Sequence, residues 1–170
     1  MKKFFLLLSI ILLSVLFTNC EKDDLCDSAT PTTSRLVIEF FDITTPTLPK
    51  NVKNLKVFAE GRTDSIGFYN NTTTIKLPLQ TAQTSTTYRL VLNSTGGEEA
   101  INTDFLKVNY SLENVFVSRA CGYKSVFQLN PVGAVERTDS SPVDGIWMNS
   151  ILITNRTIES ENETHIKVYF

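Results

Sequence analysis

The sequence predicts an all-β protein: a single antiparallel β-sandwich of about eight or nine strands, with an Ig-like or related Greek-key topology. Three observations lead to this expectation. Apolar and polar residues alternate with a period of two in one segment after another, and these segments are enriched in β-branched and aromatic residues. Clusters of polar turn residues separate the segments at short intervals, as in proteins built from many short strands.

The first expected strand covers residues 36–41, in which Leu36, Ile38 and Phe40 would share one face of a sheet. Pro46 ends this segment, because proline has no N–H to donate to a strand ladder. The same alternation defines further strands at 55–60, 74–79, 88–92 and 106–110.

The remaining expected strands are short apolar segments in two pairs, and each pair flanks a turn. They are 115–117 and 125–129 around Cys121-Gly122-Tyr123, and 151–153 and 166–170 around the acidic turn 159–163. Beyond residues 1–19, no stretch sustains the 3.6-residue apolar period of a helix. We therefore expect residues 35–170 to form one β-sandwich domain.

Residues 1–19 have the pattern of a lipoprotein signal peptide. Lys2 and Lys3 provide a positive start, and residues 4–17 form an apolar run too short to cross ~30 Å of hydrocarbon comfortably as a helix. The run ends in Leu16-Phe17-Thr18-Asn19-Cys20, which resembles a lipobox, although Asn19 replaces the usual small residue. We expect cleavage before Cys20 and lipidation of its sulfur; an ordinary signal peptide and an N-terminal membrane helix are the alternatives.

A lipidated Cys20 would anchor the chain to a membrane, because two or more acyl chains, at ~0.8 kcal/mol per buried methylene, give durable attachment. Residues 20–34 are then a lipid-anchored polar tether. Lys22, Asp23 and Asp24 resemble the signal that sends lipoproteins of the Bacteroidetes to the outer face of the outer membrane. We expect these three residues to be an export signal and the protein to be surface-exposed. A periplasm-facing position and a merely solvated spacer are the alternatives.

With Cys20 assigned to lipid, Cys26 and Cys121 are the two remaining cysteines, and we expect them to form a disulfide in an oxidising compartment. A bridge closing so long a loop could stabilise the fold by ~4–5 kcal/mol in the chain-entropy model. The alternative is a reactive thiol. The sequence favours it less, because it contains no CxxC pair and one histidine.

Composition excludes some classes of partner. The net charge is −2, and lysine and arginine do not cluster, so we expect no nucleic-acid partner. No phosphate-binding loop and no set of zinc ligands is recognisable, so we expect no cofactor and no metal.

Catalytic chemistry finds little support in the sequence. His165 has no marked nucleophile or orienting acid and no GxSxG motif accompanies it, so it is interpreted as an exposed strand residue. A pair of carboxylates for glycoside hydrolysis is not recognisable. The oxygen-rich segment 138–145 is interpreted as a turn, with a calcium loop as the alternative, although its spacing does not fit an EF-hand.

Two aromatic segments could bind a sugar or a peptide by stacking. Trp147 lies in an apolar stretch and is more simply a core residue; packing is also the favoured interpretation of the aromatic turn 68–71. Ser28, in Asp27-Ser28-Ala29, and Ser65, in Asp64-Ser65-Ile66, resemble the O-glycosylation motif of exported Bacteroidetes proteins. We expect Ser28, in the polar tether, to be the modified residue.

Several segments together resemble a family of small lipoproteins of the Bacteroidetes that is known only as a domain of unknown function. They are Cys20-Glu21-Lys22-Asp23-Asp24 with Cys26, Pro31-Thr32-Thr33, 35–40, 54–57, Cys121-Gly122-Tyr123 and the final segment 165–170. The resemblance implies lipidation and a location in the cell envelope. It implies no activity.

These observations favour a non-enzymatic binding or structural module, tethered to the outer membrane through the lipid at Cys20. Its partner would be an envelope protein or a glycan. The alternative is a small hydrolase or an accessory subunit of a glycan-uptake system.

Overall fold

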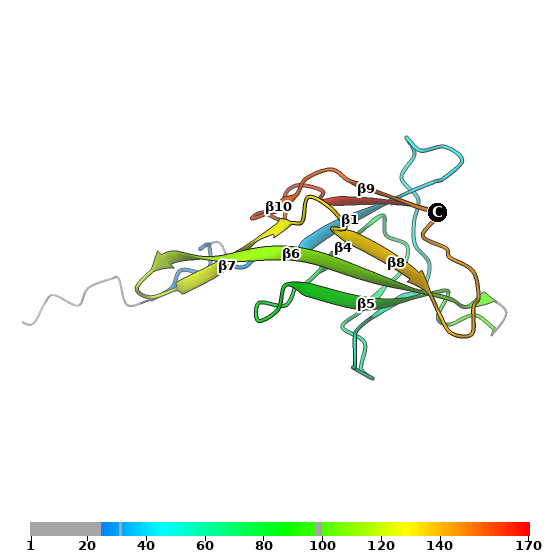
Figure 1. The fold of residues 1–170 in the computed structure, drawn as a ribbon, viewed down its shortest axis with the longest axis horizontal. Coiled ribbons are helices and arrows are strands. Elements are labelled where there is room, and N and C mark those ends of the chain that lie inside the picture. The colour runs from blue at the N-terminus through cyan, green and yellow to red at the C-terminus, as the bar shows by residue number, and fades with distance from the viewer. Residues whose placement is uncertain (1–24, 31, 98–99) are drawn as a thin grey trace, which may run out of the picture. The chain divides into compact units, whose positions relative to one another are not determined.

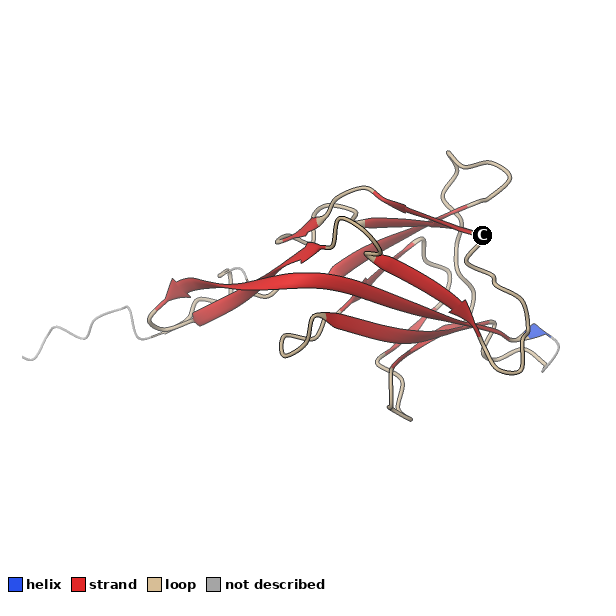
Figure 2. Ribbon diagram, in the orientation of Figure 1, coloured by secondary structure: helices blue, strands red, loops and turns tan. Residues whose placement is uncertain are grey.

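A computed structural model describes residues 25–30, 32–97 and 100–170 of the chain. This part contains eleven strands in two packed sheets and no α-helix, and Ala100 belongs to a 3-10 turn (Figure 2). The predicted all-β sandwich is therefore confirmed.

The strands follow one another in the chain with short connections. Their bounds are β1 Leu36–Phe41, β2 Leu55–Ala59, β3 Gly67–Tyr69, β4 Thr74–Leu77, β5 Ser85–Leu92, β6 Asn102–Ser118, β7 Gly122–Leu129, β8 Val135–Asp139, β9 Ser150–Ile153, β10 Thr157–Ile158 and β11 Ile166–Tyr169.

Four strands form one sheet, in the order β4-β1-β11-β9, and seven form the other. The larger sheet has the order β10-β7-β6-β5-β2-β3, and β8 also pairs with β6. Figure 1 shows β1 and β9 in one layer and β5 and β6 in the other. In this arrangement the last strand, β11, lies inside the smaller sheet, between β1 and β9.

One strand pair departs from the prediction of a purely antiparallel sandwich. β1 and β11 run parallel, with Ile38 opposite Ile166 and Phe41 opposite Tyr169. Apolar alternation has the same period in parallel and antiparallel strands, so the sequence carries no sign of this direction.

The core is formed by the inward faces of the alternating strands. In β5 every second residue from Thr86 to Leu92 is buried, and in β6 the same pattern runs from Asp104 to Tyr110. Two buried tyrosines keep hydrogen-bond partners: the hydroxyl of Tyr88 donates to the carbonyl of Pro78, and that of Tyr110 donates to the carbonyl of Gln80. Burial raises the pKa of both phenols, so they stay neutral.

The acidic turn before β11 is joined to the start of the domain. The carboxylate of Glu161 accepts two hydrogen bonds from the Arg35 guanidinium, each 2.8 Å long, and the Lys76 ammonium lies 3.2 Å away. These hydrogen bonds from Arg35, with a further one from Lys76, lower the pKa of Glu161 to about 2.

Three strands of the structure, β3, β8 and β10, were not predicted, and two strands that were predicted separately form one continuous strand. β3 and β10 are very short, and β8 consists largely of exposed polar residues, so none of them carries a clear apolar alternation. The segments predicted as separate strands at 106–110 and 115–117 belong to the single strand β6. The backbone stays extended through Glu113 and Asn114, where the apolar pattern stops.

The chain divides into two compact units. Of the described residues, the sandwich unit comprises 32–97, 100–115 and 124–170, and the second unit combines 25–30 with Phe116–Tyr123. Within residues 25–30, 32–97 and 100–170, no helix is long and apolar enough to span a membrane.

The central position of β11 leads to a prediction on stability. Val168 is buried opposite Phe40 of β1 and Ile151 of β9, whereas Val132 is an exposed loop residue. Val168→Ala should lower the free energy of unfolding by about 2–3 kcal/mol, because it removes two buried methyl groups and leaves a cavity. Val132→Ala, the same chemical change, should stay within about 0.5 kcal/mol of the wild type. Urea unfolding measures both, and equal losses would contradict the central placement of β11.

Candidate functional site

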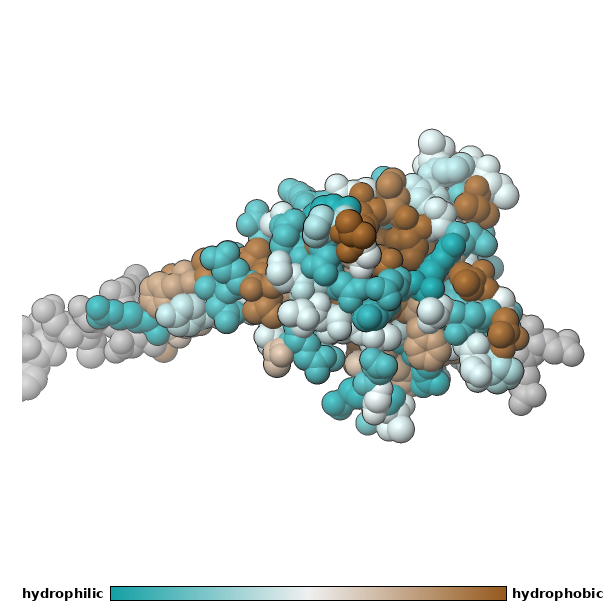
Figure 3. Space-filling view, in the orientation of Figure 1, coloured by the Kyte–Doolittle hydropathy of each residue, from teal (hydrophilic) through white to brown (hydrophobic). Residues whose placement is uncertain are grey.

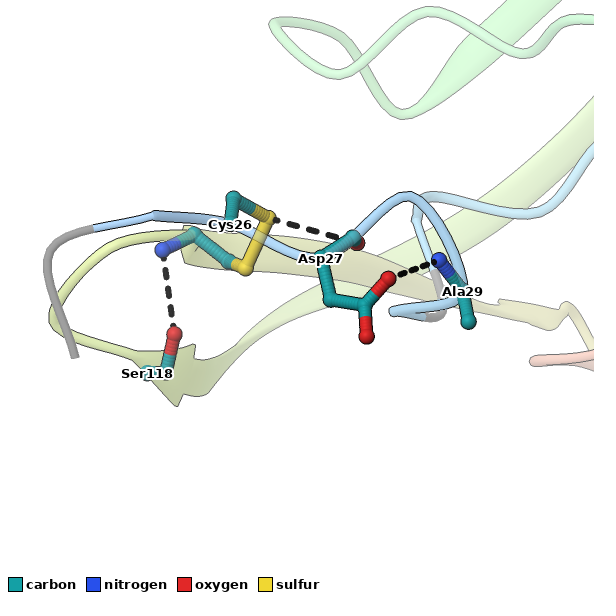
Figure 4. The surroundings of a disulfide bond; sticks show 5 residues. Cys26, Asp27, Ala29 and Ser118 are labelled. Carbon is teal, nitrogen blue, oxygen red and sulfur yellow. Dashed lines mark hydrogen bonds between the residues drawn. A yellow bond between two sulfur atoms is a disulfide. The ribbon is translucent and has the colours of Figure 1, made fainter. Parts of the chain in front are cut away.

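A disulfide bond joins Cys26, in the N-terminal segment, to Cys121, in the connection between β6 and β7 (Figure 4). The two Cα atoms lie 4.9 Å apart, and 95 positions separate the cysteines in the sequence. The predicted pairing is therefore confirmed. Gly122, next to Cys121, has φ +69°, a backbone conformation that favours glycine, and it leads the chain into β7.

Short-range hydrogen bonds shape the turns on both sides of the disulfide. On the hairpin, the backbone N–H of Cys121 donates to Oγ of Ser118 over 3.0 Å. On the N-terminal side, Oδ1 of Asp27 accepts the N–H of Ala29 at 3.0 Å, and the Asp27 carbonyl accepts the N–H of Thr30 at 2.9 Å (Figure 4). Cys121 therefore lies in a hydrogen-bonded turn, and Cys26 lies directly before another.

The same unit exposes large apolar side chains. Phe116 of β6 is 56% exposed and Tyr123 of β7 is 69% exposed, and their rings meet edge to face with centroids 5.4 Å apart. Leu25, next to Cys26, is 85% exposed. A shallow pocket of about 400 Å³ lies in this unit, lined by Leu25, Asp27, Thr30 and 118–121.

Phe116 and Tyr123 were not expected to form a surface feature. From the sequence, Phe116 was predicted to lie in an apolar strand and Tyr123 in a turn. The polar pair Glu113-Asn114 could have indicated that the residues after it are exposed, because it ends the buried alternation of β6.

The other predicted residues of the tether fall into two groups. Cys20, Lys22, Asp23 and Asp24 lie outside the described residues. Ser28 is exposed within the Asp27 turn, so its hydroxyl is accessible, and its glycosylation stays a prediction.

His165 is not the exposed strand residue that the sequence suggested, because its side chain is only 1% exposed. Its Nδ1 accepts the backbone N–H of Val37 in β1 at 2.9 Å, and the backbone N–H of His165 donates to the Val37 carbonyl. The ring must be neutral to accept this bond, and burial lowers its pKa despite the raising influence of Glu163 and Glu161. The partner of its Nδ1 lies 128 positions away in the sequence, so no local pattern indicated this burial. His165 helps to align β11 with β1.

The predicted core position of Trp147 is confirmed. Its indole is buried and lies edge to face with the ring of Phe170, with centroids 5.5 Å apart, and 6.2 Å from the ring of Phe40. A buried indole offers no stacking surface to a sugar. Phe68, for which packing was expected, is instead 51% exposed on β3.

The carboxylates of the segment 138–145 accept backbone N–H groups, from the segment itself and from Thr103 of β6. Asp139 accepts the N–H groups of Ser140 at 2.7 Å and Gly145 at 3.0 Å, one on each carboxylate oxygen. Asp144 accepts the N–H of Thr103 at 2.9 Å. These bonds agree with the turn interpretation. In the part of the chain that the structure describes, no group of three or more His, Cys, Asp or Glu side chains is placed to hold a metal ion.

Asp104 is the most unusual acid of the sandwich. It lies opposite Asp139 across β6 and β8 and is fully buried. Burial raises its pKa, while its Oδ2 accepts the N–H of Met148 at 2.9 Å. Burial also acts to raise the pKa of Asp139, but three backbone N–H groups lower it overall.

A cavity of about 480 Å³ lies beside the segment 138–145. It is lined by Arg89, Ile101, Thr103, Phe105 and 140–144. Asp144 is the one carboxylate among the described residues of this lining. Asp104 is not part of the lining and has no solvent exposure. Asp139 is not part of the lining either, so neither of the two acids with divergent pKa values is available to a substrate in this cavity.

Comparison with known proteins gives one match. Residues 54–170 match the model of a family described as a family of unknown function (DUF6452). No curated protein and no solved structure matches the chain. The matched region includes Cys121 and β11, while Cys26 and β1 precede it.

The buried imidazole leads to a prediction on pH. The folded-state pKa of His165 is lowered, so stability is greatest above the unfolded-state value of about 6.5 and falls as the pH drops below it. Because His165 is the one histidine of the chain, this loss should be at most about 2 kcal/mol between pH 6.5 and 5.

Two substitutions at this position separate charge from hydrogen bonding. His165→Asn keeps an acceptor for the Val37 N–H and does not titrate, so its stability should be flat between pH 6.5 and 5. His165→Leu should lie about 1–3 kcal/mol below His165→Asn throughout this pH range, since the buried N–H of Val37 is left without a partner. Urea unfolding across this range gives both curves. A wild-type slope that persists in His165→Asn would show that another group carries it.

Proposed function

The chain belongs to the family of unknown function (DUF6452), and from its own residues and geometry we propose that it is a cell-envelope lipoprotein. Its β-sandwich is a non-enzymatic binding or structural module, held at the outer membrane through acyl chains on Cys20. Its partner is another envelope protein or a glycan.

The observation that carries this proposal is the disulfide between Cys26 and Cys121. Disulfides persist in oxidising compartments outside the cytoplasm and are rare within it. The bond therefore supports export, and it leaves Cys20 as the one cysteine free for acylation.

The sequence around Cys20 supports the anchor and the address. The apolar run 4–17 precedes the cysteine in the manner of a lipoprotein signal peptide, and Lys22, Asp23 and Asp24 follow it in the pattern of a surface-export signal. These residues favour the outer face of the outer membrane over a periplasm-facing position.

The described part of the sandwich favours binding over catalysis. The imidazole of His165 is committed to a backbone N–H, and the carboxylate oxygens of Asp139 accept backbone N–H groups. The largest cavity described above presents one carboxylate, Asp144.

The alternative, a small hydrolase or an accessory subunit of a glycan-uptake system, rests on the same cavity. Its Arg89 and Phe105 could contact a polar ligand, but hydrolysis of a glycoside by a retaining or inverting route uses two carboxyl groups. The accessory role is compatible with a binding module, so the geometry favours it over the hydrolase.

Acylation can be tested with one substitution and one control. Cells given a fatty acid that carries an alkyne should label the wild-type protein and leave Cys20→Ala without label, because Cys20 supplies the thioether and the new amino terminus. The double variant Cys26→Ser/Cys121→Ser should keep the label, since neither cysteine carries lipid. Full labelling of Cys20→Ala would contradict the proposal.

A further inference from the structure

The unit that contains the disulfide carries an apolar surface that the proposed anchor alone does not explain. Phe116 and Tyr123 lie on the paired strands β6 and β7, side by side and more than half exposed. Leu25 adds a third exposed apolar side chain from the N-terminal segment. In the view of Figure 3, hydrophobic residues are present at the surface of the β6–β7 hairpin end. Apolar residues gathered in this way usually mark a contact surface.

The chain length between the anchor and the disulfide limits where this surface can be. Six residue steps connect Cys20 to Cys26, and a fully extended chain of this length spans roughly 20 Å. The disulfide then places the Cα atom of Cys121 only 4.9 Å from that of Cys26. The hairpin end is therefore held within roughly 25 Å of the residue that would carry the acyl chains.

The side chains have the chemistry of a membrane interface. Tyrosine combines an apolar ring with a polar hydroxyl and is enriched where headgroups meet hydrocarbon. Arg119, exposed in the turn between Phe116 and Tyr123, can extend its guanidinium to headgroup phosphates while its stem stays among apolar groups.

We propose that Phe116 and Tyr123, with Leu25, form a lipid-contact surface that enters the interface of the bilayer in which Cys20 is anchored. The bilayer is favoured over a protein partner because the short tether keeps it within reach of the hairpin end at all times. The inference rests on acylation of Cys20 as proposed above. Since acyl chains alone give durable attachment, this contact fixes the position of the disulfide-linked unit at the surface and adds little to the affinity.

Fluorescence quenching by lipid tests the contact. The acylated protein carrying Tyr123→Trp is reconstituted into phosphatidylcholine vesicles whose acyl chains carry bromine close to the headgroup. Phe68→Trp is the matched control, because Phe68 is an exposed aromatic residue on β3 of the sandwich unit. Trp147 is buried and contributes the same background to both variants.

The proposal expects the fluorescence added by Tyr123→Trp to fall by about half or more on brominated vesicles, with a shift to shorter wavelength. The fluorescence added by Phe68→Trp should change little. Quenching of neither variant in protein that floats with the vesicles would overturn the lipid contact. If the fluorescence of Tyr123→Trp shifts to shorter wavelength only when other envelope proteins are added to the vesicles, the surface binds a protein partner. That result would also overturn the lipid contact.

The intact mass of the same samples separates the two proposals. Protein without acyl chains on Cys20 would overturn the proposed function, and this inference with it. Acylated protein without quenching would overturn the inference alone.

A variant without the disulfide tests the role of the bond. Combined with Tyr123→Trp, the change Cys26→Ser/Cys121→Ser should reduce the quenching, while the circular dichroism of the β-sandwich stays unchanged. Undiminished quenching in folded protein would show that the bond does not position the surface.

Discussion

The covalent bond between Cys26 and Cys121 is the constraint on which the N-terminal unit of the structure depends. The described part of that unit, residues 25–30 and Phe116–Tyr123, is too small to bury a core of its own. Its aromatic pair stays exposed, and its side-chain hydrogen bonds described above lie within local turns beside the β6–β7 pairing. The disulfide supplies the long-range connection that a core would otherwise provide.

The sandwich unit is stabilised in a different way, by burial and by hydrogen bonds to several of its buried polar side chains. β11 joins β1 in a parallel pair, and His165 extends that pairing by accepting the N–H of Val37 through its side chain. The hydroxyls of Tyr88 and Tyr110 reach backbone carbonyls from within the core. Such satisfied polar groups fix the register of a core without the cost of an unpaired donor.

Sequence patterns predicted those parts of the fold in which burial follows a simple period. The alternation of β1, β5 and the first half of β6 identified strands and inward faces, and counting cysteines identified the disulfide. The parallel pairing of β1 with β11 was not predictable, because direction does not alter the period. The burial of His165 depends on a backbone N–H distant in sequence. The exposure of Phe116 and Tyr123 likewise depends on what packs against β6 and β7, which a local pattern does not record.

Together, these features describe a β-sandwich unit and a second unit whose two chain segments are joined by one oxidised cysteine pair. The most direct test of this account is the state of the cysteines in protein extracted from native envelopes, alkylated without reduction and digested. The account predicts a cross-linked peptide pair containing Cys26 and Cys121 and an amino-terminal peptide that begins at an acylated Cys20. Alkylated thiols at both Cys26 and Cys121, or a chain that still begins at Met1 without fatty acid, would contradict it.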